Sequence, residues 1–152
     1  MTAGDILYET ELFVKKFTVK ANEDIEKGEL CYDDGNGILA ATAADAVAGK
    51  VVMALEAHDY SEKTTHQIAC VVRGFVEAQK VSGSGGANSL DKLTISATAG
   101  EVTKFAKGAA PAANTYATAS MQTALDTNLG VIGHAVEASL DADTTQKMFL
   151  GA

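Results

Sequence analysis

The chain has 152 residues, of which 47% are hydrophobic and 21% charged, as in an ordinary globular protein. Its net charge of −8 argues against binding to nucleic acid or to an anionic membrane, because both need a cationic face. No apolar run approaches the roughly 20 residues of a transmembrane helix. This length fits one domain, or two small β lobes around a shared core, and needs no disulfide or metal to stay folded.

The N-terminal residues lack the basic and apolar regions of a secretory signal. We therefore expect synthesis and initial folding in a cytoplasm. The two cysteines, Cys31 and Cys70, are too few for a disulfide framework, and each lies in an apolar run. We expect both to be reduced, buried thiols.

The chain begins with a segment that we expect to form an N-terminal arm (residues 1–11), followed by a first strand (residues 11–20). Polar residues of this strand alternate with four apolar ones, Leu12, Val14, Phe17 and Val19. The alternation slips once, at Lys15-Lys16, which predicts a β-bulge. Residues 1–20 are thus set apart from a β-rich domain in residues 21–152.

Short strands are predicted next, at residues 29–32 and 38–40. The glycine-rich turn at 33–37 between them suits a hairpin, because Gly and Asn tolerate positive φ. Residues 42–47 are either a loop or one helical turn. Strands follow at 50–57 and 67–78. The second of these is apolar on both faces, which is typical of a central or interface strand.

The second half starts with a Gly- and Ser-rich segment, residues 81–89, that predicts a flexible connection. Further strands are expected at four places, residues 90–97, 102–105, 131–138 and 146–150. Residues 108–128 are rich in Ala and Thr, and a short helix is expected near 120–126. Residues 93–95 and 102–104 correspond to residues 30–32 and 37–39 of the first half.

An internal repeat organises these elements. Residues 54–57, Ala-Leu-Glu-Ala, recur as Ala-Val-Glu-Ala at 135–138, an offset of 81. Each copy follows a glycine and precedes an acidic turn and an apolar strand ending in Gly. We therefore predict a mainly β fold: a single compact β-sandwich or barrel with internal pseudo-duplication and one short helix at most. Its similar halves span about 21–80 and 90–152.

Candidate chemistry is sparse. His58 and His66 flank one loop without further ligands, so we expect surface histidines rather than a metal site. The acidic turns at 33–37 and 141–143 lack the bidentate glutamate of a calcium loop. Glu56 and Glu137 are equivalent by the repeat, and we interpret them as polar residues of alternating strands rather than an acid/base pair. We expect no catalytic set, no metal and no other cofactor.

The C-terminal residues carry a resemblance. Gly130-Val131-Ile132-Gly133-His134-Ala135-Val136-Glu137-Ala138, the turn at 141–143 and the last strand follow Ala97-Thr98-Ala99-Gly100-Glu101-Val102-Thr103. This pattern resembles the small capsid decoration, or cement, proteins of tailed phages and prophages. The resemblance covers residues 20–152, with a longer insertion at 108–128. It implies a β-tulip-like, often trimeric protein on the outer surface of an icosahedral capsid, where it stabilises the shell.

The resemblance implies the major capsid protein and further copies of the chain as partners, and the virion as location. The arm is our candidate for strand addition to the capsid, with its four apolar residues, Leu12, Val14, Phe17 and Val19, as anchors. Three residues, Val71, Phe75 and His134, are candidates for the subunit interface. The alternative is a carbohydrate- or receptor-binding β-sandwich of a virion fibre or spike, which would need an exposed aromatic platform. An enzyme ranks third.

Overall fold

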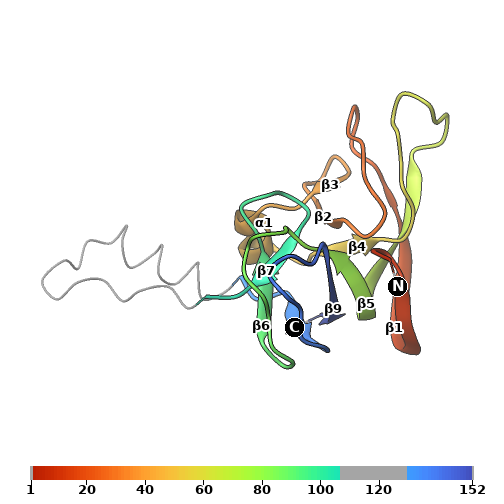
Figure 1. The fold of residues 1–152 in the computed structure, drawn as a ribbon. Coiled ribbons are helices and arrows are strands. Elements are labelled where there is room, and N and C mark those ends of the chain that lie inside the picture. The colour runs from red at the N-terminus through yellow and green to blue at the C-terminus, as the bar shows by residue number, and fades with distance from the viewer. Residues whose placement is uncertain (1, 107–129, 152) are drawn as a thin grey trace, which may run out of the picture.

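The computed structural model of the protein describes residues 2–106 and 130–151. Within them, nine strands form one sheet curled into a half-barrel, accompanied by one short helix (Figure 1), so the predicted mainly β, barrel-like fold is confirmed. The elements are β1 (Ile6–Thr18), β2 (Leu30–Asp33), β3 (Ile38–Ala40), α1 (Ala43–Ala48), β4 (Val52–Ala54), β5 (Gln67–Gln79), β6 (Lys92–Ile95), β7 (Val102–Lys104), β8 (Gly133–Ala135) and β9 (Thr145–Leu150). The helix expected near 120–126 lies outside the described residues.

The strand order confirms the predicted duplication. Neighbouring strands follow β3-β2-β4-β5-β9-β8-β6-β7, with β1 paired to β5 beside this path. The order contains β3-β2-β4-β5 and, reversed, β7-β6-β8-β9. Equivalent strands also pair in equivalent registers, because Ala54 of β4 lies opposite Cys70 as Ala135 of β8 lies opposite Met148.

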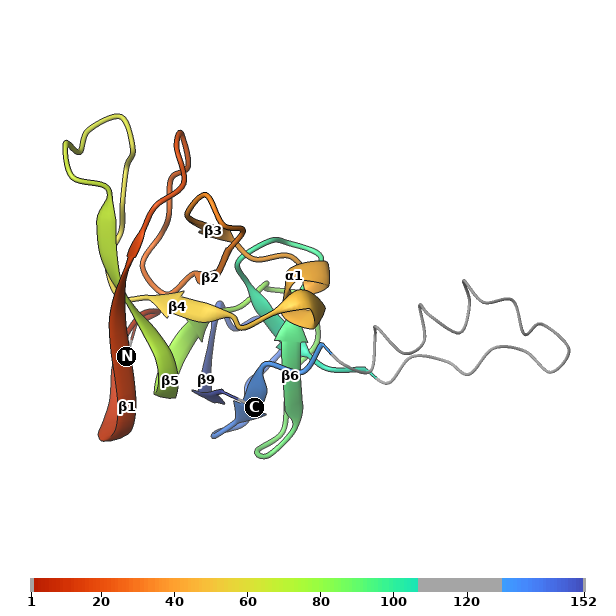
Figure 2. The ribbon, with the colours of Figure 1, turned by 180° about the vertical axis from the view of Figure 1, so that it is seen from behind.

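One strand, β5, belongs to both halves. Its first part pairs with β4 at Val71 and Cys70, and its second part pairs with β9 from Gly74 to Gln79. β1 runs along β5 on the side away from β4 and β9, as Figures 1 and 2 show. This dual role explains why both faces of the strand are apolar, and it confirms the prediction of a central strand.

Each half curls until its first strand meets its third. A parallel bridge joins Val19, after β1, to Ile38 of β3, and an equivalent bridge joins Lys80, after β5, to Val102 of β7. The chain of pairings therefore closes on itself in both halves, which leaves few free sheet edges.

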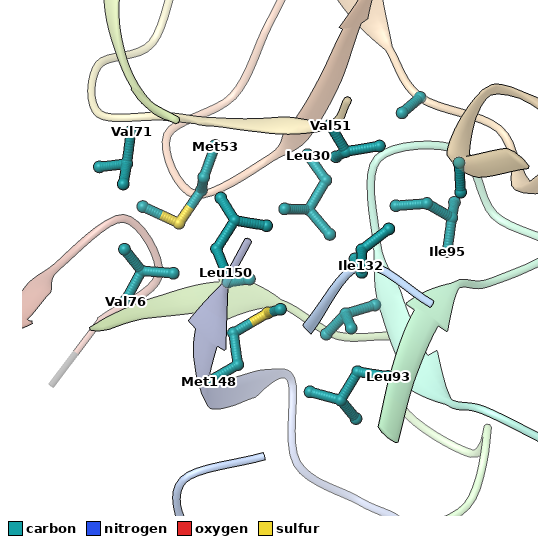
Figure 3. Packing of buried hydrophobic residues seen from close by; sticks show 14 of the residues in the cluster. Leu30, Val51, Met53, Val71, Val76, Leu93, Ile95, Ile132, Met148 and Leu150 are labelled. Carbon is teal, nitrogen blue, oxygen red and sulfur yellow. The ribbon is translucent and has the colours of Figure 1, made fainter. Parts of the chain in front are cut away.

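Buried side chains form two clusters. The first lies inside the first half, and the second fills the space between the halves and the interior of the second half (Figure 3). Interior positions correspond one to one. The first half supplies Val19, Ile25, Cys31, Ile38, Val52, Ala54, Ile68 and Cys70, and the second supplies Lys80, Ala87, Leu93, Val102, Gly133, Ala135, Gln146 and Met148, all buried. Two apolar positions have thus become polar, at Lys80 and Gln146.

At two of these positions the two halves divide the side-chain volume differently. Val52 and Cys70 of the first half correspond to Gly133 and Met148 of the second. A Cβ atom added to Gly133 would lie 2.7 Å from Met148 Cε and 2.1 Å from the Phe149 carbonyl oxygen. The longer methionine therefore takes the space that the valine fills in the first half, and close packing requires a glycine at position 133 of the neighbouring strand.

The structure corrects the prediction for the N-terminus. β1 begins at Ile6 and pairs with β5, and Val19 is buried in the core, so residues 6–19 belong to the β domain rather than to an arm set apart from it. The register shifts lie between Ile6 and Val14 rather than at the two lysines. Residues 42–48 take the helical alternative, because Thr42 and Asp45 form a capping box at the start of α1.

The Gly- and Ser-rich connection is tied to the turn that follows β8, contrary to a flexible linker. Gly83 N–H donates to the Asp141 carbonyl oxygen, and Gly85 N–H donates to the Asp141 side chain. Ala87 and Ser139 form a two-way backbone bridge. These contacts fix the connection between the halves against the second one.

Candidate functional site

The predicted capsid-binding residues of β1 divide into exposed and buried ones. Val14 is 41% exposed, and Leu12 and Phe17 are half-buried against the core. Val19 is 2% exposed, so its side chain is occupied within the chain and cannot anchor a partner. Sequence reasoning missed Phe13, which is 58% exposed, because the register shift beside it was expected two residues later.

The side of β1 that faces away from β5, called here the outer edge, carries unpaired backbone groups. Val19 N–H donates to the His66 carbonyl oxygen, and bonded pairs alternate in an antiparallel ladder. The N–H and C=O of Lys16 and the N–H of Thr18 therefore point away from β5. No partner for these three groups occurs within residues 2–106 and 130–151.

Three side chains, Phe75, Phe149 and His134, form what we call the aromatic row on the outer face of β5, β9 and β8. His134 lies opposite Phe149, and Phe149 lies opposite Phe75 with ring centroids 4.9 Å apart. The Arg73 guanidinium lies 5.5 Å from the Phe149 ring centroid. The structure thus brings two predicted interface residues, Phe75 and His134, together through Phe149, which sequence reasoning did not select.

Burial within the chain separates the third predicted interface residue, Val71, from this row. Val71 and Met53 occupy the positions equivalent to Phe149 and His134, and both are 0% exposed in the core between the halves. The structure therefore corrects the prediction for Val71, whose side chain has no surface to offer a second subunit. In the second half the same positions carry half-buried side chains that remain accessible.

The expectation of surface histidines is wrong for His58. It is 3% exposed, and its Nε2 lies 3.1 Å from Nδ1 of His66, whose ring stacks on Tyr60 at 3.8 Å. This cluster packs the loop before β5 against Ile25 through a backbone bridge at His58. Over the described part of the chain, no group of three or more His, Cys, Asp or Glu side chains is arranged to hold a metal ion.

The remaining ionisable groups make local contacts. Glu56 accepts a hydrogen bond from Ala69 N–H of β5, whereas Glu137 forms an ion pair with Lys147 of β9. The two equivalent glutamates therefore contact different strands and not each other. One oxygen of the buried Glu77 carboxylate, Oε2, has no hydrogen-bond partner among the described residues. It adjoins a cavity of about 250 Å³ lined also by Asp143 and Thr145.

Both thiols are buried and free, as predicted. Burial raises the pKa of Cys70 to about 12, with a smaller contribution from the Glu56 charge. Burial also raises the pKa of Cys31 well above its usual range. Neither thiol is therefore a nucleophile at neutral pH, because the thiolate is the reactive form.

Among the described residues, no helix is long and apolar enough to cross a membrane. Comparison of the chain with protein-family models and with curated protein sequences finds no match. The outer edge of β1 and the aromatic row are therefore the two surfaces of the described residues that best fit a binding function.

Proposed function

We propose that this protein is a capsid decoration protein, which binds the outer surface of an icosahedral virion shell and stabilises it. The segment with the decoration-protein pattern, β8 to β9, folds as the counterpart of β4 to β5 in one duplicated sheet. This agreement between the pattern and the framework is the observation that carries the proposal. Decoration would act by mass action, because each bound copy stabilises the assembled shell relative to its parts.

The aromatic row supports assembly of the chain as a homotrimer. Half-buried Phe149 and His134 occupy positions whose counterparts in the first half, Val71 and Met53, are completely buried. Aromatic side chains are enriched in protein interfaces, where they bury much area with little loss of conformational freedom. Covering Phe149 and His134 with a second copy would give these two positions the burial that Val71 and Met53 have within the chain.

The exposed part of β1 supports the contact with the major capsid protein. Phe13 and Val14 are 58% and 41% exposed, and they neighbour the unpaired outer edge. A capsid subunit could therefore be held by backbone hydrogen bonds and apolar contacts together, as in strand addition.

The direct experiment mixes the purified protein with expanded, genome-free capsids and measures co-sedimentation and the temperature of capsid disruption. We expect bound protein in the pellet and a higher disruption temperature. Protein that stays in the supernatant, with an unchanged disruption temperature, would contradict the proposal.

Phe149→Ser tests the subunit interface separately. Its expected effect is a shift from trimer to monomer in light scattering, with unchanged circular dichroism. The matched control is Leu140→Ser, which alters a residue that is 73% exposed and lies outside the row. A wild-type monomer, or a trimer that survives the change at Phe149, would rule out this interface.

A further inference from the structure

The outer edge of β5 in the second half is filled by residues from the first half of the same chain. Gly4 N–H donates to the Glu77 carbonyl oxygen at 2.6 Å, and Glu77 N–H donates to the Asp5 carbonyl oxygen at 3.0 Å. Gln79 N–H donates to the Gly28 carbonyl oxygen at 2.9 Å. This cover also buries the Glu77 side chain, which is 4% exposed.

The equivalent edge in the first half is the outer edge of β1. Lys16 lies opposite Ala69 as Glu77 lies opposite Lys147, and Thr18 lies opposite Gln67 as Gln79 lies opposite Thr145. The N–H and C=O of Lys16 and the N–H of Thr18 are thus the counterparts of the three filled groups. In the described part of the chain nothing fills them, and the Lys16 side chain is exposed.

A groove runs beside this edge. It has a volume of about 450 Å³ and lies between residues 15–18 of β1 and the turn at 33–37. The corresponding space beside β5 holds the segment around Gly4 and Asp5. The first half therefore keeps an open groove where the second half has a bound extended segment.

Charge indicates which kind of segment fits. Lys15 and Lys16 are the only adjacent pair of basic residues in a chain of net charge −8, and both are exposed. Neither forms an ion pair with another described residue; Lys15 lies 5.3 Å from the Phe17 ring centroid. The segment that fills the equivalent groove carries Asp5, whose carboxylate contacts Lys27.

A second copy of the chain is a poor occupant. Two β1 edges in antiparallel pairing would bring the lysines of one near those of the other, and like charges across strands are destabilising. The N-terminal segment of a second copy is already bound in its own groove. An acidic strand from a different protein avoids both, and in the groove it meets two lysines against one acidic side chain, Asp33.

We infer that the groove between β1 and the turn at 33–37 is a strand-acceptor site for an extended, acidic segment of a partner protein. The segment adds antiparallel to β1, bonds to Lys16 and Thr18, and places carboxylates near Lys15 and Lys16. The inference deepens the strand addition proposed for the capsid contact, but it is argued from the contacts of β1 alone. The peptide titration below uses no capsid, so its failure is distinguishable from a failure of capsid binding.

The test titrates the full-length protein with a synthetic peptide of the sequence Thr-Ala-Gly-Asp-Ile-Leu-Tyr, which copies residues 2–8. Hydrogen exchange of individual amides is followed by NMR. We expect the Lys16 and Thr18 amides to exchange at least about tenfold more slowly with the peptide, since new backbone bonds protect them. The same peptide with Lys in place of Asp should give weaker protection.

Two variants separate the contribution of the backbone hydrogen bonds from that of the lysine charge. Lys16→Pro removes the outward N–H, a change that edge strands tolerate, and should abolish protection at Thr18 without lowering the melting temperature substantially. Lys16→Ala keeps the N–H and should weaken binding only in part. Unchanged exchange at Lys16 and Thr18 up to millimolar peptide, equal protection by the Lys peptide, or full protection at Thr18 in Lys16→Pro would overturn the inference.

Discussion

Replacing Lys80 tests the most unusual feature of the core. Lys80 is 4% exposed, and its Nζ donates to the carbonyl oxygens of Val81, Asp141 and Asp143 at 3.1, 3.2 and 3.3 Å. The counterpart in the first half is Val19, a plain apolar residue. We expect that Lys80→Met, which keeps most of the side-chain volume, destabilises the fold because three acceptors lose their donor.

The magnitude follows from these contacts. Each hydrogen bond to a charged group contributes about 1.5–3 kcal/mol, but a carbonyl that water can reach recovers much of the loss. Asp141 is exposed, and Val81 and Asp143 are half-buried, so water can replace a large part of the lost bonding. The buried methionine also adds apolar burial. We therefore expect a net loss of about 2–4 kcal/mol, a large share of the ~5–15 kcal/mol typical of a domain.

Urea denaturation at neutral pH measures this loss as a change in midpoint at constant slope. The matched control is Lys63→Met, at an exposed lysine, which should change the free energy of unfolding by less than about 0.5 kcal/mol. Because Lys80 is buried, added salt should leave the difference between the variants unchanged. A loss below about 1 kcal/mol, or no greater than the control, would refute the stabilising role of the ammonium group.

Three further predictions concern single positions. Gly133→Ala should lower the free energy of unfolding by about 1–3 kcal/mol or more in urea denaturation, because the added Cβ meets the backbone of Phe149; an unchanged midpoint would show that β8 moves freely. In the folded protein, Cys31 and Cys70 should not react with a thiol reagent at about pH 8, whereas both should react in denaturant; rapid labelling of the native protein would contradict their burial. Burial raises the pKa of the Glu29 carboxyl, so its charged form opposes folding as pH rises above the ordinary carboxyl range. Glu29→Gln should therefore increase stability at neutral pH, and the gain should vanish in acid; an equal gain at both pH values would exclude this cause.

The sequence alone predicts the framework because the framework repeats. Strand periodicity, glycine turns and the recurrence at Ala54 and Ala135 identify the described strands from β2 to β9. The exact register of the paired strands could not be predicted from the sequence. The repeat in the sequence aligned Leu93 with Leu30, whereas the strand ladders make Leu93 the counterpart of Cys31. A slip of one residue turns every side chain to the other face.

The surfaces were predictable only in part for the same reason. Val71 and Phe149 are equivalent, yet one is buried between the halves and the other lies on the outside. That difference arises from how the two halves pack on each other, which no local pattern encodes. Likewise, the sequence alone predicts an exposed side chain for Lys80. Its burial is explained only by the three carbonyl groups that the fold brings around its ammonium group.

The sharing of β5 has a consequence for how the molecule folds and evolves. A fragment ending at residue 80 would leave the second part of β5 without β9, and a fragment beginning at residue 81 would leave β9 without β5. Cutting the chain at the Gly- and Ser-rich connection therefore yields no independent unit, although composition marks it as a boundary. The halves should unfold in one cooperative transition. A duplication that overlaps by a strand also cannot be undone by deleting one copy, so both halves must evolve together.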